Sequence, residues 1–240
     1  MAKNVIILVA SYKLLVKLCM VLIFDFDGTI VHSKKMCLFV FKKAFKKHGF
    51  PFTYLQIAPH FGPPAKAVIE GLIGQKNQDL VKKIEKEVGF LKRTIGLKMM
   101  RLRCPPNFLK KLAKKHFLIL RTNADRFSTF KFLKIHGIFN LWQEIITPED
   151  KISESPLKAD QPLADKIKTL RYFKNKFKNK KSPIVYIGDL TSDIKAARSA
   201  AIYSVAIPGF DKIKDLQEAR PNFLIRRLNS LPEVLKTIKY

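Results

Sequence analysis

Asp25-Phe-Asp-Gly-Thr29 decides the fold of this chain, together with the apolar run Val21-Leu-Ile-Phe24 that precedes it. Four apolar residues that stop abruptly at polar ones are typical of a buried parallel strand that ends in a tight turn. Gly28 permits the sharp backbone bend that this turn needs. The stretch therefore predicts a central strand with two carboxylates, Asp25 and Asp27, at its carboxyl end.

Two further apolar runs have the same pattern. Phe117-Leu-Ile-Leu120 ends at Thr122-Asn123, and Ile184-Val-Tyr-Ile187 ends at Gly188-Asp189. Each run leads into a stretch with helical spacing, and two more short strands are expected at 144–147 and 204–207. Alternating strands and helices predict an α/β fold with a Rossmann-like parallel sheet.

Residues 32–100 differ from the rest because they contain no convincing strand. Apolar residues recur at helical spacing in 36–48, 65–73 and 80–90, and Pro63-Pro64 breaks the chain before the middle helix. We expect residues 32–100 to form a helical cap inserted after the first strand. The catalytic core would then comprise 20–31 and 101–240, and residues 1–19 would be an N-terminal appendage of uncertain role.

The charge of the chain is unusual, since 46 Lys and Arg face 19 Asp and Glu for a net charge of +27 over 240 residues. We favour background composition as the explanation, and a polyanion such as nucleic acid is the alternative. Against nucleic acid, the basic residues are spread over cap and core with no pattern of a known binding module. The eight basic residues of 166–181 predict a solvated face.

The remaining composition indicates the compartment. Three cysteines without a CxxC pair argue against a disulfide framework or a zinc site and fit a reducing cytoplasm. Lys13 and Lys17 interrupt the apolar N-terminal residues, so no uncharged run reaches the roughly 18 residues of a membrane span. No cleavage site of a signal peptide is evident. We expect a cytoplasmic protein with no transmembrane segment.

The polar residues at the three strand ends suggest one reaction. Ligands of parallel sheets lie beyond the carboxyl ends of the strands, where these side chains would meet. A carboxylate such as Asp25 can attack phosphorus and form a covalent intermediate, provided that a cation separates the two anions. Asp25 and Asp189 could hold Mg²⁺ together with phosphate oxygens. Asp27 could protonate the leaving oxygen, and Thr122 and Asn123 could hold the transferring oxygens.

These motifs resemble those of the haloacid dehalogenase superfamily. Asp25-Phe-Asp-Gly-Thr29 is similar to its first motif, Thr122 to its second and Gly188-Asp-Leu-Thr-Ser-Asp193 to its fourth. His60-Phe-Gly-Pro63 resembles the cap of the phosphoglycolate-phosphatase-like branch. The resemblance covers about residues 20–210, and it implies a Mg²⁺-dependent phosphatase.

The resemblance also implies a role for each site residue. Asp25 would be the nucleophile and Asp27 the general acid and base, and the dehalogenase branch lacks this second acid. Thr122 and Lys158 would take part in catalysis, and Gly28 and Asn123 would bind phosphate. Mg²⁺ would be held by the Asp25 carboxylate, the Asp27 backbone carbonyl and Asp189. Asp193 would contact the ion directly or through water.

The chain departs from the family pattern in three places. Lys158-Ala-Asp-Gln-Pro162 is the nearest match to the third motif but has an altered context, and Lys151 is the rival. Arg121 stands before Thr122 where an apolar residue is usual. His32 stands where such phosphatases often carry Asp. These changes affect the expected substrate more than the expected chemistry.

The predicted function is hydrolysis of a small phosphate monoester through an aspartyl phosphate. The cap would close over the substrate and exclude water, with residues 60–66 touching the leaving group. One alternative is a phosphomutase, which passes the phosphoryl group to a second hydroxyl. The other is a phosphatase of polynucleotide ends or a nucleic-acid-binding protein, which we do not favour.

Overall fold

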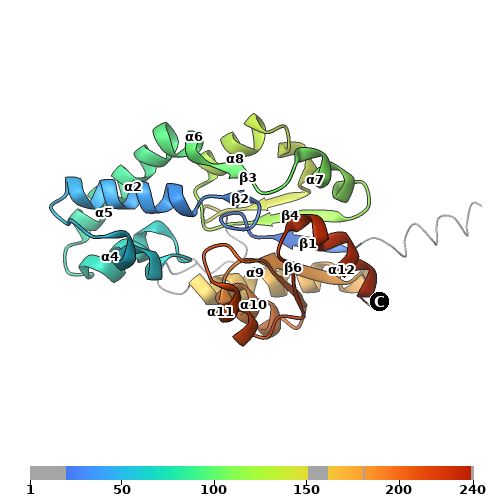
Figure 1. Ribbon diagram of the computed structural model, residues 1–240. Helices are drawn as coiled ribbons and strands as arrows, with labels where there is room; N and C mark the ends of the chain where they lie inside the picture. The colour runs from blue at the N-terminus through green and yellow to red at the C-terminus, as the bar shows by residue number, and fades with distance from the viewer. Residues whose placement is uncertain (1–19, 151–161, 181, 239–240) are drawn as a thin grey trace, which may run out of the picture.

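The computed structural model describes residues 20–150, 162–180 and 182–238 (Figure 1). It confirms the α/β fold, with a six-stranded parallel sheet in the order β5-β4-β1-β6-β7-β8. Its strands are β1 (Val21–Phe24), β4 (Phe117–Arg121), β5 (Glu144–Ile146), β6 (Ile184–Gly188), β7 (Tyr203–Ala206) and β8 (Phe223–Leu224). The predicted N-terminal appendage of residues 1–19 lies outside the described residues.

Strand β1 lies in the middle of the sheet, as its uninterrupted apolar sequence predicts. All four of its residues are buried because helices cover both faces. The chain first adds β4 and β5 on one side of β1 and then returns to add β6, β7 and β8 on the other. Phe24 is in register with Leu120 of β4 and Ile187 of β6. The residues that follow these three strands therefore meet at one edge, at the topological switch point where α/β proteins bind ligands.

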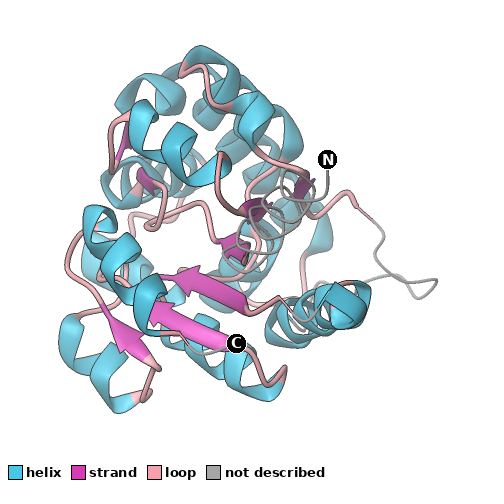
Figure 2. Ribbon diagram, turned by 90° about the vertical axis from the view of Figure 1, so that its right-hand side faces the viewer, coloured by secondary structure: helices cyan, strands magenta, loops and turns pink. Residues whose placement is uncertain are grey.

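Helices cover both faces of the sheet (Figure 2). Leu22 and Phe24 point into the larger core cluster, which includes residues of α7 (Pro106–Ala113), α8 (Arg126–Ile135) and α12 (Leu231–Thr237). Val21 and Ile23 point into the opposite cluster with α9 (Pro162–Lys176) and α10 (Thr191–Ser199). Helix α11 (Ile213–Glu218) packs beside α10. This alternation follows from the two-residue period of a strand.

A helical lobe projects from the carboxyl end of the sheet, at the left of Figure 1. It lies between β2 (Val31–His32) and β3 (Arg101–Leu102), which pair antiparallel as a narrow connection to the sheet. Its helices are α2 (Lys34–Lys47), α3 (Tyr54–Ile57), α4 (Ala65–Ile73), α5 (Gln78–Leu91), the π-helix η2 (Lys92–Gly96) and α6 (Leu97–Met99). Helices therefore occur in all three segments where the spacing predicts them. This lobe is termed the cap below.

Short 3₁₀ turns complete the fold. They are η1 (Ala58–His60), η3 (Phe139–Leu141), η4 (Lys178–Lys180) and η5 (Leu228–Ser230). Within the parts of the chain that the structure describes, no helix has the length and apolar character needed to cross a membrane.

Candidate active site

Three carboxylates gather at the carboxyl edge of the sheet. Asp25 follows β1, Asp189 follows β6, and Asp193 lies in the first turn of α10. One oxygen of each lies within 4.8 Å of the others, and all three side chains are buried. The sequence predicted that these side chains lie close together, because the residues that follow parallel strands lie at the same edge of the sheet.

This clustering makes the carboxylates hard to ionise. Burial raises the pKa of Asp25 well above its usual range, and the charge of Asp193 raises it further, while Lys166 and Arg121 oppose this. Burial and Asp193 likewise raise the pKa of Asp189 well above its usual range. A divalent cation would relieve this repulsion, and oxygen ligands of this kind suit Mg²⁺. The residues present therefore fit a metal.

Asp193 holds the site together through four hydrogen bonds. Its Oδ1 accepts from Lys166 Nζ at 2.5 Å and from the Tyr186 hydroxyl at 3.1 Å. Its Oδ2 accepts from the backbone N–H groups of Asp189 at 3.1 Å and Leu190 at 2.9 Å. A carboxylate offers about four acceptor positions, so these partners use all of them. Asp193 thus fixes the loop after β6 and orients Lys166.

Lys166 is a site residue that the sequence analysis missed. The solvated face predicted for 166–181 is wrong at this position, because only 2% of Lys166 is exposed and its ammonium forms an ion pair with Asp193. The apolar positions Leu170 and Phe173, four and seven residues further on, place Lys166 on the buried side of α9. That periodicity was the available signal. Lys158 and Lys151, the predicted candidates for the third motif, lie outside the described residues.

Asp27 and Gly28 form the turn after β1. Asp27 lines the central cavity, and its Oδ1 is buried without a hydrogen-bond partner among the described residues. Such an oxygen is available to a ligand. Gly28 has a φ of +78°, and its backbone lies directly against the Asp189 carboxylate. Arg103 secures this turn by donating hydrogen bonds to the carbonyls of Gly28 and Pro208.

Replacing Gly28 by Ala is expected to damage both the fold and the site. A methyl group there would overlap the Asp189 carboxylate and the Phe210 ring, and the positive φ adds strain of about 1–3 kcal/mol. We expect a fall in the melting temperature and weaker binding of a divalent cation, measured by calorimetry. Gly137→Ala is a matched control, because Gly137 has a φ of +62° with no atom near its would-be Cβ. Equal metal affinity in the Gly28 and Gly137 variants would contradict this reading.

Thr122 and Asn123 follow β4 and both line the cavity. The buried Thr122 hydroxyl accepts a hydrogen bond from the backbone N–H of Ala124 at 2.9 Å, which leaves its proton available for another acceptor. The Asn123 amide donates to the Gly62 carbonyl at 2.6 Å. Asn123 therefore joins the core to the cap, a contact that the sequence analysis did not predict.

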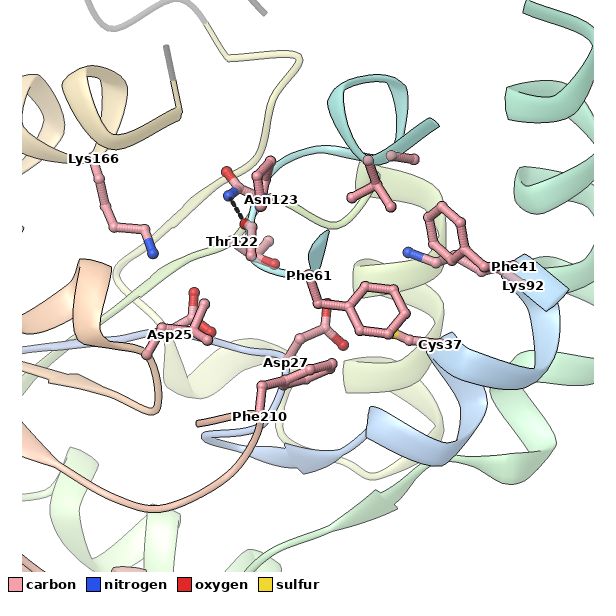
Figure 3. A pocket seen from close by; sticks show the side chains of 15 residues that line it. Asp25, Asp27, Cys37, Phe41, Phe61, Lys92, Thr122, Asn123, Lys166 and Phe210 are labelled. Carbon is pink, nitrogen blue, oxygen red and sulfur yellow. Dashed lines mark hydrogen bonds between the residues drawn. The ribbon is translucent and has the colours of Figure 1, made fainter. Parts of the chain in front are cut away.

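The cavity lies between core and cap (Figure 3). Its volume is about 60 Å³, and a second hollow of about 240 Å³ shares six of its lining residues: Phe61, Gly62, Pro63, Asn123, Lys166 and Leu190. The core contributes mainly polar groups, and the cap contributes mainly apolar ones such as Phe41, Phe61 and Val68. Four residues of the predicted contact segment 60–66 line it: Phe61, Gly62, Pro63 and Ala65. This geometry suits a small substrate enclosed by the cap.

A parallel sheet with a helical lobe over a buried acidic cluster defines an α/β enzyme that can handle an anion with the help of a metal. Residues 22–207 match the family model described as haloacid dehalogenase-like hydrolase. The chain belongs to the haloacid dehalogenase-like hydrolase family. The predicted family, the fold and the hydrolase class of the enzyme are confirmed.

Proteins similar to this chain match it over most of its length and most of their own. A phosphoglycolate phosphatase of Vibrio cholerae is 25% identical over 226 residues, covering 88% of this chain and 95% of its own. A structure described as a predicted phosphoglycolate phosphatase from Haemophilus somnus is 20% identical with a TM-score of 0.74, covering 90% and 97%. A family hydrolase from Bacillus subtilis, bound to magnesium, is 19% identical with a TM-score of 0.59, covering 91% and 99%.

Proposed function

We propose that this hydrolase is a Mg²⁺-dependent phosphatase of small phosphate monoesters. The observation that carries the proposal is the cluster of Asp25, Asp189 and Asp193 beside a small cavity that Asp27 and Lys166 also line. The name of the Vibrio cholerae relative supports phosphate-ester chemistry. The cap residues that line the cavity, among them Phe41, Phe61 and Val68, favour a small enclosed metabolite over a polymer end.

The chain's own residues can carry both halves of the reaction. An Asp25 oxygen attacks phosphorus, the bond from phosphorus to the leaving oxygen breaks, and Asp27 donates a proton to that oxygen. Water then attacks the aspartyl phosphate, Asp27 takes its proton, and inorganic phosphate leaves as Asp25 is restored. Thr122 and Lys166, which line the cavity with Asp25, would hold the phosphoryl oxygens, and Lys158 remains the sequence-based candidate for the lysine role.

Magnesium would be held by the carboxylates of Asp25 and Asp189 and by the Asp27 backbone carbonyl. Asp193 already accepts four hydrogen bonds, so we expect it to act through water or through Lys166. When bound, the ion offsets the repulsion between the nucleophile and the phosphate. The magnesium in the Bacillus subtilis relative supports this choice of ion.

Magnesium is expected to stabilise the protein more at pH 8 than at pH 5. Without metal, the pKa of Asp25 and of Asp189 is raised above the ordinary carboxyl value of 3.8. The protonated carboxyls therefore stabilise the folded state below pH 3.8, and this contribution is lost as pH rises through the raised pKa. Magnesium binds the deprotonated carboxylates, so its stabilising effect grows over the same range. At 100 times the Kd we expect the melting temperature to rise by about 5–10 °C at pH 8.

Differential scanning fluorimetry with and without Mg²⁺ at both pH values checks this, with Asp189→Asn as the control. The increment should be much smaller in Asp189→Asn. The site assignment fails if the increment is the same at both pH values or in both proteins.

The test of the function is phosphate release from a panel of small phosphate monoesters, with Mg²⁺ or EDTA at constant ionic strength. Magnesium-dependent turnover supports the phosphatase. Transfer of phosphate to a second hydroxyl, without release, would replace it by a mutase. Neither release nor transfer from a folded protein would refute the proposal.

We also infer a cytoplasmic location. Cys37 and Cys104 are buried free thiols, which fits a reducing compartment. Fractionation of the source cells checks this, and recovery of the protein with an extracytoplasmic fraction would contradict it.

A further inference from the structure

Lys92 is a cap residue that neither the family motifs nor the proposed chemistry uses. It is the first residue of the π-helix η2, directly after α5. Figure 3 shows its ammonium group directed into the cavity from the cap side, with Asp25 and Lys166 on the other side. Single π turns within helices occur often at functional sites, because they redirect side chains.

The ammonium group of Lys92 lacks a close partner of opposite charge. Among the described residues no hydrogen bond or ion pair joins it to another side chain, although the Asp27 and Asp125 carboxylates act on it from further away. Its neighbour Cys37 is a neutral thiol at physiological pH, because burial raises its pKa to about 12. An ammonium group that lines a partly enclosed cavity without a close counter-ion is costly, and a bound anion would remove that cost.

Lys92 nevertheless stays charged. Burial lowers its pKa, and the carboxylates of Asp27 and Asp125 raise it. The apolar rings of Phe41 and Phe61 line the same cavity and limit its water. An ion pair formed there is stronger than one formed at the surface.

The position of Lys92 indicates which part of a substrate it would meet. The attacked phosphorus must lie beside Asp25, where Lys166 and Arg121 supply positive charge. The leaving oxygen must lie beside Asp27, which donates its proton. In Figure 3 Asp27 lies between Asp25 and Lys92. An anion at Lys92 would therefore belong to the leaving group and not to the transferred phosphoryl group.

We propose that Lys92 determines specificity by binding a second anionic group, a carboxylate or a phosphate, on a short leaving group of the phosphate monoester. The inference rests on the proposed phosphatase function and narrows its substrate class. Asp25, Asp27 and Lys92 line the same cavity, so we expect only a short leaving group between the two anionic groups.

The test compares three esters that differ at the far end of the leaving group. They are 2-phosphoglycolate with a carboxylate, isobutyl phosphate as its uncharged isostere, and ethane-1,2-diyl bisphosphate with a phosphate. We expect the wild type to favour one of the charged esters over isobutyl phosphate by about 10–100-fold in kcat/KM. Whichever charged ester is favoured identifies the anion. Lys92→Met should remove that preference, mainly through a higher KM.

Lys82→Met is the matched control. Lys82 is an exposed residue of α5, so this variant changes the net charge by the same amount without changing the cavity. Its preference should equal that of the wild type. The inference is overturned if Lys92→Met weakens all three esters equally, if Lys82→Met has the same effect as Lys92→Met, or if the wild type shows no preference.

A binding measurement separates this inference from the proposed function. Isothermal titration with 3-phosphonopropanoate and with 3-methylbutylphosphonate needs no turnover. Tighter binding of the carboxylated phosphonate in the wild type, lost in Lys92→Met, supports the subsite even if no ester is hydrolysed. The subsite is refuted if the wild type binds the two phosphonates with equal affinity and also hydrolyses the bisphosphate no better than isobutyl phosphate. This holds even if the phosphatase is established.

Discussion

Asp25→Asn is expected to reduce phosphate release by about four orders of magnitude or more, which is the scale seen when a covalent nucleophile is removed. An amide oxygen carries no charge and cannot form the aspartyl phosphate. The fold should remain intact and even gain stability, because Asp25 is buried among carboxylates that repel it. Phosphate release, circular dichroism and the melting temperature measure these three expectations.

Asp27→Asn is the informative companion, because it should also lose turnover but for a different reason. Its nucleophile is intact, so acid quenching after addition of a labelled ester with a good leaving group should trap covalent phosphate in this variant. None should be trapped in Asp25→Asn. Covalent phosphate in Asp25→Asn would contradict the role of Asp25 as nucleophile. Near-normal turnover in a folded Asp27→Asn protein would contradict the role of Asp27 as general acid and base.

The acidic half of the site was predictable from the sequence because strand ends define it. Asp25 and Asp189 follow uninterrupted apolar runs, and a parallel sheet brings the residues after such runs together. Gly28 was predictable as a turn residue for the same local reason. Its close approach to the Asp189 carboxylate was not, because the two residues are distant in sequence and meet only when the sheet forms.

The basic half of the site could not be predicted in the same way. Lysines are so abundant in this chain that composition does not distinguish Lys166 from its exposed neighbours. Its burial depends on which side of α9 faces the sheet, and the direction of Lys92 depends on a π turn that no local pattern signalled. The contact between Asn123 and Gly62 depends on how the cap rests on the core.

Lys166→Met is expected to lower kcat by about 100–1000-fold and to destabilise the fold by about 3–5 kcal/mol. The stability loss follows because Asp193, which is fully buried, would lose its ion-pair partner. Lys168→Met is the matched control, since Lys168 lies on the exposed side of the same helix. Steady-state kinetics, measured at a temperature where every variant is folded, and chemical denaturation check both effects.

Lys158→Met is the variant that compares the sequence-based candidate with the buried lysine. If Lys166 holds the phosphoryl oxygens, Lys158→Met should retain most of the wild-type kcat. A large loss in Lys158→Met, with near-normal kcat in folded Lys166→Met, would assign the third motif to Lys158 instead.

A double-mutant cycle with Asp193→Asn separates the two effects of Lys166. Removing both charges should restore much of the stability, because neither is then left buried without a partner. If Lys166 acts only by holding Asp193 in place, Lys166→Met should cost nothing further in kcat in the Asp193→Asn background. If Lys166 contacts the phosphoryl group, it should cost at least about another 10-fold there, because the lost charge stabilisation does not pass through Asp193. We expect the second result, since the cavity that Lys166 lines is the one that Asp25 and Thr122 also line.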